Sequence, residues 1–302
     1  MTSIKQKSNP SSNQVEDSSE AFALFASSSI GLPQEIIEDR FNQIVAPSNP
    51  EYYQYRLAAL NKTKGGAASA LKTQVQEFES YRDRYKTVRD NLLLEIPKAI
   101  QKFRYEFPDF DGSNKIYVVH SLGELNGGTR AISGKRRFLL GIDVIAQIHF
   151  WTNQGPFLIH ELFHLYHMEK NPALFQTDSV GLALWKEGLA TYVSEKLSSN
   201  ATPAEIMLEI PNGLFENCQA NLKTLSTFLK KNLKAVDEDI YTLYFLMTGG
   251  GDKIPKRAGY CVGYFAAKEV AKGLSLSQMV SLSEAEVYSR LSTALNSLSD
   301  VE

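Results

Sequence analysis

The sequence is short of cysteine, of net charge and of long apolar runs, and each shortage excludes a class of protein. Its only cysteines among 302 residues are Cys218 and Cys261. They form no CxxC pair, so we exclude a disulfide framework and a cysteine zinc site and expect two free, buried side chains. The formal net charge of -2 lacks the basic footprint of a nucleic-acid-binding protein. No apolar run approaches the length of a membrane span.

The first residues of the chain carry no readable targeting information. Residues 1–19 are rich in Ser, Asn, Gln and Lys, which cannot bury apolar area, and we expect a disordered tail. The apolar run Ala21–Ala26 follows acidic residues, whereas a signal peptide needs a basic flank. We therefore expect a soluble protein that is cytoplasmic, or secreted without a recognisable signal peptide.

The N-terminal third of the chain has a helical pattern. Apolar residues recur at spacings of three and four within residues 67–107, which predicts one long helix. Pro97 should kink or split this helix, because proline lacks a backbone N–H. We expect residues 20–112 to form a helical N-terminal region.

The pattern changes after Gly112, where two segments favour strands. Ile116–His120 and Arg137–Asp143 are rich in β-branched and apolar residues. The glycine-rich segment Leu125–Gly134 between them is expected to be a loop. The chain then reads as helices to its end, so we predict an α+β fold in which residues 113–302 form a functional domain around a small sheet.

Three of the five histidines stand in one apolar segment that contains the pattern HExxH, where His160 and His164 flank Glu161. On a helix, residues four apart share a face, so both imidazoles can reach one zinc ion. Glu161 can then take a proton from a zinc-bound water. The neighbouring residues are apolar nearly all round, which predicts a buried central helix. The competing interpretation is a buried helix with two hydrogen-bonded histidines.

A catalytic zinc ion needs a third protein ligand, and Glu187 is the best candidate. It interrupts the apolar helical pattern of residues 181–195. An unpaired carboxylate is costly to bury on such a face, and a zinc ion would remove that cost. The alternative is a surface glutamate on an amphipathic helix.

These two segments, HELFH at residues 160–164 and LWKEGLATY at residues 184–192, resemble the motifs of the gluzincin clan of zinc metallopeptidases. That clan includes thermolysin and the zinc aminopeptidases, and the sequence is more loosely similar to bacterial families of predicted zinc-dependent proteases. The resemblance implies a zincin-like fold, with a helical C-terminal lobe, in which His160, His164 and Glu187 bind zinc. It also implies that Glu161 is the general base.

The sequence departs from the aminopeptidase pattern in three respects. Twenty-two residues separate His164 from Glu187, a few more than in those enzymes. Lys186 stands where they often have asparagine, and no GxMEN-type motif precedes the zinc helix. The missing motif weakens any inference that a free amino terminus is recognised.

The remaining histidines are less suited to bind the same ion. On a continuous helix, His167 lies about 10 Å along the axis from His160, and no glycine turns the chain as in HExxHxxGxxH. We therefore expect His167 to be a structural or supporting residue. His120 and His149 are expected to make ordinary polar contacts.

The residues that would contact a substrate are predicted partly from the resemblance. Zinc peptidases often pair an extended substrate with an edge strand, and the strand Phe138–Asp143 is the candidate, or else a core strand. Gly128 could let a substrate backbone approach, or it could lie in a plain turn. Gluzincins commonly supply a tyrosine or histidine from the C-terminal lobe to stabilise the transition state. By that resemblance Tyr260 is the catalytic candidate, and Tyr264 and Arg257 are substrate-binding candidates; both tyrosines could instead pack between helices.

We therefore predict a zinc metallopeptidase, a hydrolase whose partner is a peptide or protein substrate and not a nucleic acid. Two alternatives remain open. The chain could be a zinc-stabilised binding protein or pseudo-protease without efficient chemistry. The helical region 20–112 could also be the functional part, as a module that binds a partner or covers the cleft.

Overall fold

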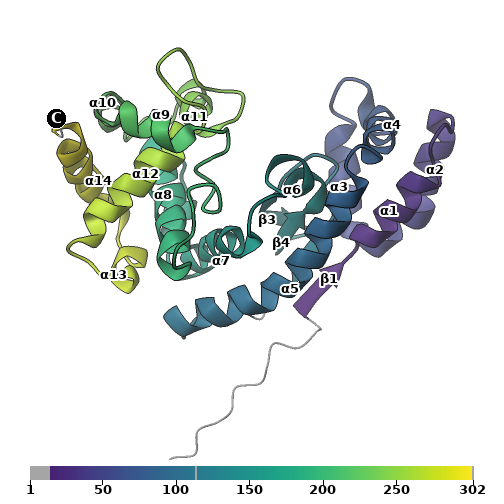
Figure 1. Cartoon of the computed structure of the whole chain (residues 1–302), viewed down its shortest axis with the longest axis horizontal. Helices are drawn as coiled ribbons and strands as arrows, with labels where there is room; N and C mark the ends of the chain where they lie inside the picture. The colour runs from purple at the N-terminus through teal and green to yellow at the C-terminus, as the bar shows by residue number, and fades with distance from the viewer. Residues whose placement is uncertain (1–13, 113, 301–302) are drawn as a thin grey trace, which may run out of the picture. The chain divides into compact units, whose positions relative to one another are not determined.

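The computed structural model describes residues 14–112 and 114–300, and it confirms a mixed protein in which helices predominate around one small sheet. The chain divides into two compact units (Figure 1). The first contains the residues up to Pro97 together with Asp111–Trp151, and the second contains Lys98–Phe110 together with the residues from Thr152 onward. The sheet thus belongs with the N-terminal helices, whereas the sequence grouped it with the residues after 112.

The first unit packs helices against this sheet. Its helices are α1 (Ser19–Ser27), α2 (Gln34–Ile44), the 3-10 helix η2 (Ala46–Ser48), α3 (Pro50–Leu60), α4 (Gly66–Phe78), the first part of α5 (Arg82–Glu106) and α6 (Ile142–Ile148). The expected single helix over residues 67–107 is wrong in one respect. It breaks at residues 79–81, where backbone N–H groups of Ser80 and Tyr81 bond three residues back. At Pro97 the helix α5 continues unbroken.

The sheet has the strand order β1-β2-β4-β3. Its strands are β1 (Val15–Asp17), β2 (Ile116–Val119), β3 (Gly127–Ile132) and β4 (Lys135–Gly141). Strand β2 pairs in parallel with β1 and β4, and β3 pairs antiparallel with β4. The expected role of residues 138–143 as a substrate-pairing edge strand is therefore wrong, because β4 has a partner on each side and α6 begins at Ile142.

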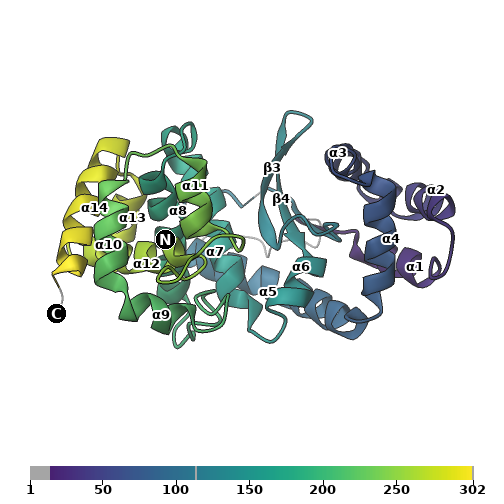
Figure 2. The same cartoon turned by 90° about the horizontal axis from the view of Figure 1, so that it is seen from above.

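Two segments that looked unstructured in the sequence are strands. The glycine-rich segment 125–134 contains β3, which forms a hairpin with β4 (Figure 2). The hairpin turns through Ser133 and Gly134, whose φ angles are 51° and 73°, as a tight turn with two left-handed residues requires. The expected tail through residue 19 is wrong for its last residues, since Val15–Asp17 pairs with β2. Residues 1–13 lie outside the described part of the chain.

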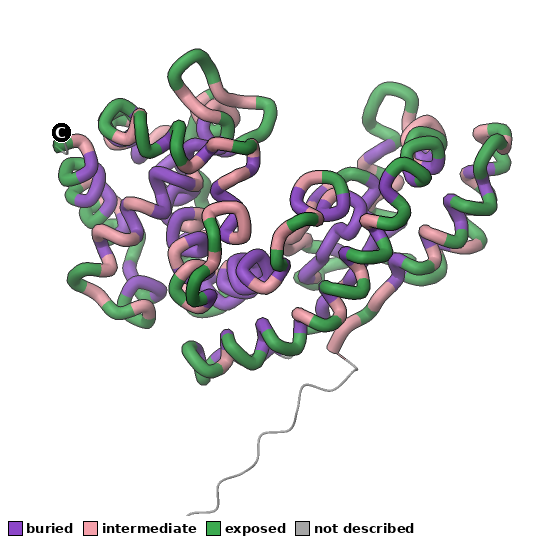
Figure 3. The backbone as a smooth tube through the Cα atoms, in the orientation of Figure 1, coloured by how far each residue is buried: buried purple, intermediate pink, exposed green. Residues whose placement is uncertain are grey.

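The second unit is helical and is built around two buried helices, α7 (Gln154–Lys170) and α8 (Val180–Leu197). Both are buried along most of their length (Figure 3), which confirms the expected buried central helix. The other helices of this unit are η3 (Pro172–Phe175), α9 (Leu214–Ala220), α10 (Leu222–Lys231), α11 (Glu238–Phe245), α12 (Ala258–Ala271), α13 (Leu276–Val280) and α14 (Glu284–Ser299). None of the helices in residues 14–112 or 114–300 is both long and apolar enough to cross a membrane.

Helices α8 and α12 lie side by side (Figure 1). They pack closely because glycines face each other where the helices meet. A Cβ atom built on Gly188 would lie 2.1 Å from the carbonyl carbon of Gly263. One built on Gly263 would lie 2.4 Å from the carbonyl oxygen of Leu184. Gly188 and Gly263 thus allow the close packing of these two helices.

Helix α12 is also joined covalently to α9. Cys218 and Cys261, whose Cα atoms are 6.4 Å apart, form a disulfide across 43 residues of sequence. The expectation of two free cysteines is therefore wrong. The sequence contains only two cysteines far apart, and nothing local in it shows that α9 and α12 become neighbours.

The contact between α8 and α12 predicts that the Gly263→Ala variant is destabilised by about 3 kcal/mol, because the added methyl group would overlap backbone that cannot move away. Urea unfolding followed by tryptophan fluorescence measures this change. Gly273→Ala is the control, since a Cβ at Gly273 meets nothing within 4 Å, and its stability should change by less than about 0.5 kcal/mol. Equal stability of the two variants would contradict the packing described here.

The disulfide predicts that the double variant Cys218→Ser/Cys261→Ser loses about 4 kcal/mol of unfolding free energy, from the entropy of closing a loop of this length. The same urea titration measures it. Wild-type protein treated with dithiothreitol should show the same loss. If the oxidised and reduced proteins unfold at the same urea concentration, the disulfide does not form.

Candidate metal centre

Helix α7 places two histidines on one face. It begins after Asn153, whose side chain accepts a hydrogen bond of 2.9 Å from the Gly155 N–H, as an N-cap residue does. His160 and His164 lie one turn apart on this helix. Because the helix is buried on nearly all sides, apolar packing helps to fix their position.

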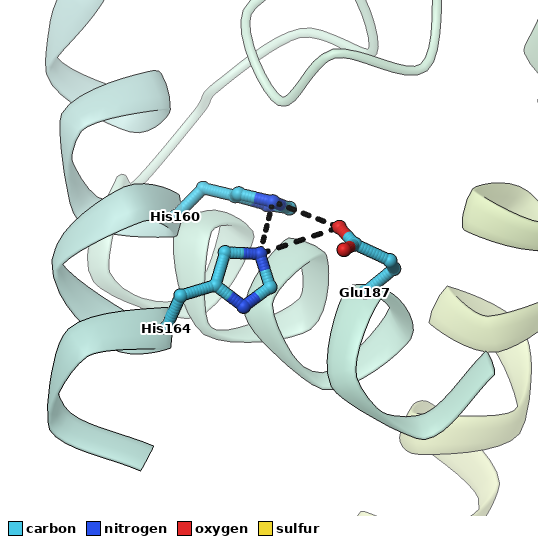
Figure 4. Close-up of side chains that lie close together, drawn as sticks. All are labelled: His160, His164 and Glu187. Atoms are coloured by element: carbon cyan, nitrogen blue, oxygen red, sulfur yellow. Dashed lines mark hydrogen bonds and ion pairs between the residues drawn. The ribbon is translucent and has the colours of Figure 1, made fainter. Parts of the chain in front are cut away.

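Helix α8 contributes Glu187, the third polar side chain of the site. It begins after Ser179, whose hydroxyl accepts a hydrogen bond of 3.1 Å from the Leu182 N–H. Glu187 follows two turns later, with 23% of its side chain exposed. Its carboxylate points toward the two imidazoles of α7 (Figure 4). The structure therefore brings together the three residues that the two sequence motifs singled out.

The three side chains have the spacing that a metal ion requires. The Nε2 atoms of His160 and His164 are 3.0 Å apart, and they lie 3.4 and 3.3 Å from Oε2 of Glu187. Ligand atoms bound at 2.0–2.1 Å to a tetrahedral ion are about 3.3–3.4 Å from one another. These three atoms could therefore hold one metal ion without a change of backbone, and a fourth position would stay open.

The charges of the three groups depend on one another. Burial alone would raise the pKa of the Glu187 carboxyl, but His164 and His160 hold that pKa well below its ordinary value of 4.5. Burial also lowers the pKa of His164, yet the charge and hydrogen bond of Glu187 outweigh it and raise that pKa above 6.5. The site thus keeps a carboxylate charged in a half-buried place by opposing it with positive charge. A bound cation would serve the same purpose.

Glu161 and His167 occupy different positions on α7. Glu161 is 9% exposed and adjoins the ligand candidate His160, as the HExxH pattern requires. His167 is fully buried between the rings of Phe163 and Phe175. Burial lowers the pKa of His167 to about 3, so its ring is neutral, and it belongs to the core rather than to the cluster.

Tyr260 is the residue of α12 that lies beside the cluster. Its ring stacks against the ring of His160, with centroids 6.4 Å apart. The guanidinium of Arg257, itself 8% exposed, lies 4.0 Å above the Tyr260 ring and donates a 2.9 Å hydrogen bond to the Ile210 carbonyl. Burial and the nearby Glu187 charge raise the pKa of Tyr260. Arg257 therefore packs over the Tyr260 ring and helps to hold that ring in place.

The predicted substrate-binding residue Tyr264 has its hydroxyl outside this cluster. The hydroxyl of Tyr264 donates a 2.7 Å hydrogen bond to Glu195, two turns beyond Glu187 on α8, and accepts one from Lys268. The Tyr264 hydroxyl is thus engaged by Glu195 and Lys268 rather than by the metal cluster. Gly128 lies in β3, in the other compact unit, and its role stays a prediction.

The structure adds residues that sequence reasoning missed. Tyr241 on α11 lines the same cavity as Glu187, and burial and the Glu187 charge raise its pKa. Lys186 on α8 forms an ion pair of 3.0 Å with Asp178, which lies just before α8. Nothing in the local sequence marks Tyr241, because α11 is separated from α8 by about forty residues of irregular and helical chain. These residues surround a cavity that opens beside Glu187.

Of the two histidines in the first unit, His120 is buried and neutral. His120 stacks on Phe22, with ring centroids 3.2 Å apart, and its Nε2 lies 3.1 Å from the Gln74 side-chain oxygen. Burial lowers the pKa of His120 to about 4. This confirms the ordinary polar contact that was expected.

In the part of the chain that the structure describes, His160, His164 and Glu187 are the one group of three or more potential ligands close enough to share a metal ion. Comparison with known proteins adds no further assignment: no protein-family model, no curated protein and no solved structure matches this chain. The interpretation of the cluster therefore depends on its own geometry and chemistry.

Proposed function

We propose that this protein is a zinc-dependent peptidase whose metal ligands are His160, His164 and Glu187. The observation that carries the proposal is the set of three distances, 3.0, 3.3 and 3.4 Å, between two imidazole nitrogens and one carboxylate oxygen. Two histidines and one glutamate form a donor set suited to zinc with an open fourth position. Such an open position favours catalysis over structural support.

The residues around the cluster have separate roles in this proposal. A bound zinc ion would supply the Lewis acid that polarises the scissile carbonyl and makes water acidic enough to deprotonate. Glu161 accepts the proton from the attacking water and delivers it to the leaving amine. Tyr260 donates a hydrogen bond to the oxygen on which negative charge develops, and Arg257 keeps the Tyr260 ring in place.

The buried surroundings of α7 and α8 support hydrolysis for a physical reason. Phe157, Leu162 and Phe163 on α7 are at most 3% exposed. The low polarity of such surroundings strengthens the interactions between the ion, the carboxylates and a developing charge. A zinc-stabilised binding protein would need the three ligands but not Glu161, so Glu161 separates the two interpretations by experiment.

The cluster predicts one tightly bound zinc ion in the wild-type protein. His160→Ala, His164→Ala and Glu187→Ala should each lower zinc affinity by more than about 100-fold, since loss of even a supporting contact costs 10–100-fold. Competition with a chromophoric chelator measures the affinity, and the cobalt-substituted protein should show a tetrahedral absorption spectrum. Glu195→Gln is the control on the same helix and should bind zinc normally. Equal zinc binding by all four variants would exclude this site.

The mechanism predicts that Glu161→Gln retains zinc but lowers kcat/KM for peptide cleavage by about 10²–10⁴-fold, because the general base is lost. Tyr260→Phe should lower kcat by about 10²–10³-fold, while Tyr264→Phe should leave it unchanged. Cleavage of a mixed peptide library, read by mass spectrometry, measures these rates. A zinc-loaded wild type that cleaves no peptide would favour the binding-protein interpretation, and full activity of Glu161→Gln would refute the mechanism.

A further inference from the structure

A cavity of about 440 Å³ opens beside the metal cluster and shares Glu187 with it. Its volume lies within the range of about 300–1,000 Å³ that ligand pockets have. One wall comes from the start of α8 and the residues before it, and the other comes from α11 and the residues before it. The lining residues are Asp178, Ser179, Val180, Ala183, Lys186, Glu187, Ala235, Val236, Asp237, Glu238 and Tyr241.

The walls of this cavity are mostly apolar. Val180 and Ala183 are buried in α8, and the Ser179 hydroxyl is occupied by a 2.8 Å hydrogen bond to Tyr288 and by capping α8. On the opposite wall, Val236 is 81% exposed and Tyr241 is 42% exposed. Exposed apolar side chains beside a cavity favour an occupant with an aliphatic or aromatic stem.

The charged groups of the cavity are mainly acidic. Four carboxylates and one ammonium line it, and that ammonium, Lys186, is already paired with Asp178 at 3.0 Å. Asp237 accepts hydrogen bonds from the N–H groups of Asp239 and Ile240 and so is fixed in place. The side chain of Glu238 has no ion pair or hydrogen bond within residues 14–112 and 114–300. Even with a divalent ion on Glu187, the lining keeps one excess negative charge (four negative against three positive).

We propose that this cavity receives a lysine or arginine side chain of the peptide substrate. The aliphatic stem would lie against Val180, Ala183 and Tyr241, and the cationic end would meet the carboxylates of Asp237 and Glu238. This inference rests on the proposed peptidase function, because it is the shared Glu187 that places the cavity next to the bond to be cleaved. It adds what that function leaves open, namely the substrate class.

The test uses binding, so that it does not depend on turnover. The zinc-loaded full-length Glu161→Gln variant is titrated with fluorescein-labelled hexapeptides of alanine and glycine, in which one lysine, norleucine or glutamate moves through the positions. Norleucine has the stem of lysine without its charge. At one position the lysine peptide should bind about tenfold more tightly than the norleucine peptide, as two partly exposed ion pairs allow, and the glutamate peptide should bind more weakly than both.

Charge-neutral variants then locate the interaction. Adding Asp237→Asn and Glu238→Gln should reduce the lysine preference to about twofold or less and leave norleucine binding unchanged. Asparagine caps a helix as well as aspartate does, so α11 should stay folded. Asp239→Asn is the control, since it removes one negative charge from the same helix end without lining the cavity.

Each outcome decides the inference. A lysine preference that disappears only in the cavity variant supports it. No binding of any peptide, no lysine preference, or an equal loss in Asp239→Asn overturns it. Failure of the proposed peptidase function is seen separately. If the zinc-loaded wild type binds lysine peptides but cleaves none, the lysine pocket is supported and the peptidase function is refuted. If it cleaves neutral and lysine peptides equally, the peptidase function is supported and the lysine pocket is refuted.

Discussion

The backbone contact between α8 and α12 is the constraint on which the helical unit depends. Gly188 and Gly263 have no side chains, so the two helices meet at their backbones. Gly188 directly follows the ligand candidate Glu187, and Gly263 lies three residues after Tyr260. The distance between the carboxylate and the aromatic ring is therefore set by an atomic contact between main chains. A site assembled from two helices gains its precision in this way, because backbone atoms have no rotamers to change.

The second constraint on the site is electrostatic. A carboxylate that is largely removed from water must be compensated, and Glu187 is compensated by the two imidazoles of α7. Without an ion, the raised pKa of His164 and the lowered pKa of Glu187 favour a proton on the imidazole beside a charged carboxylate. A divalent cation replaces that proton with a stronger positive charge. The same arrangement of the three ligand atoms is thus compatible with the site with and without an ion, and the carboxylate is charged in both states.

The sequence predicted the metal cluster better than it predicted the fold, for a physical reason. Helical periodicity alone places residues four apart on one face, so His160 and His164 could be paired from local spacing. Glu187 was identified because a charge does not fit an apolar pattern. The pairing of Cys218 with Cys261, the inner position of β4 and the orientation of Tyr264 all depend on contacts between distant segments, and no local pattern encodes them.

The glycine-rich strand and the cavity illustrate the same limit. Strand β3 could not be recognised from the sequence, because glycine is rare in strands on average. The Ser133-Gly134 turn is nevertheless of the kind that closes a hairpin. The cavity is formed by residues about sixty positions apart, which only the packing of α11 beside α8 makes neighbours. Apart from Lys186 and Glu187, its lining residues belong to no motif, since a pocket is a property of the space between elements.

The way in which the ligands are supported has a consequence for how an ion would be exchanged. His160, His164 and Glu187 project from α7 and α8, which already pack against each other, and α8 also packs against α12. No loop has to fold around the ion. The metal would enter a site whose shape exists beforehand and would leave without unfolding it. Metal supply, rather than folding, would then set the fraction of active molecules, and the chain would persist as an intact, reloadable apoprotein when zinc is scarce.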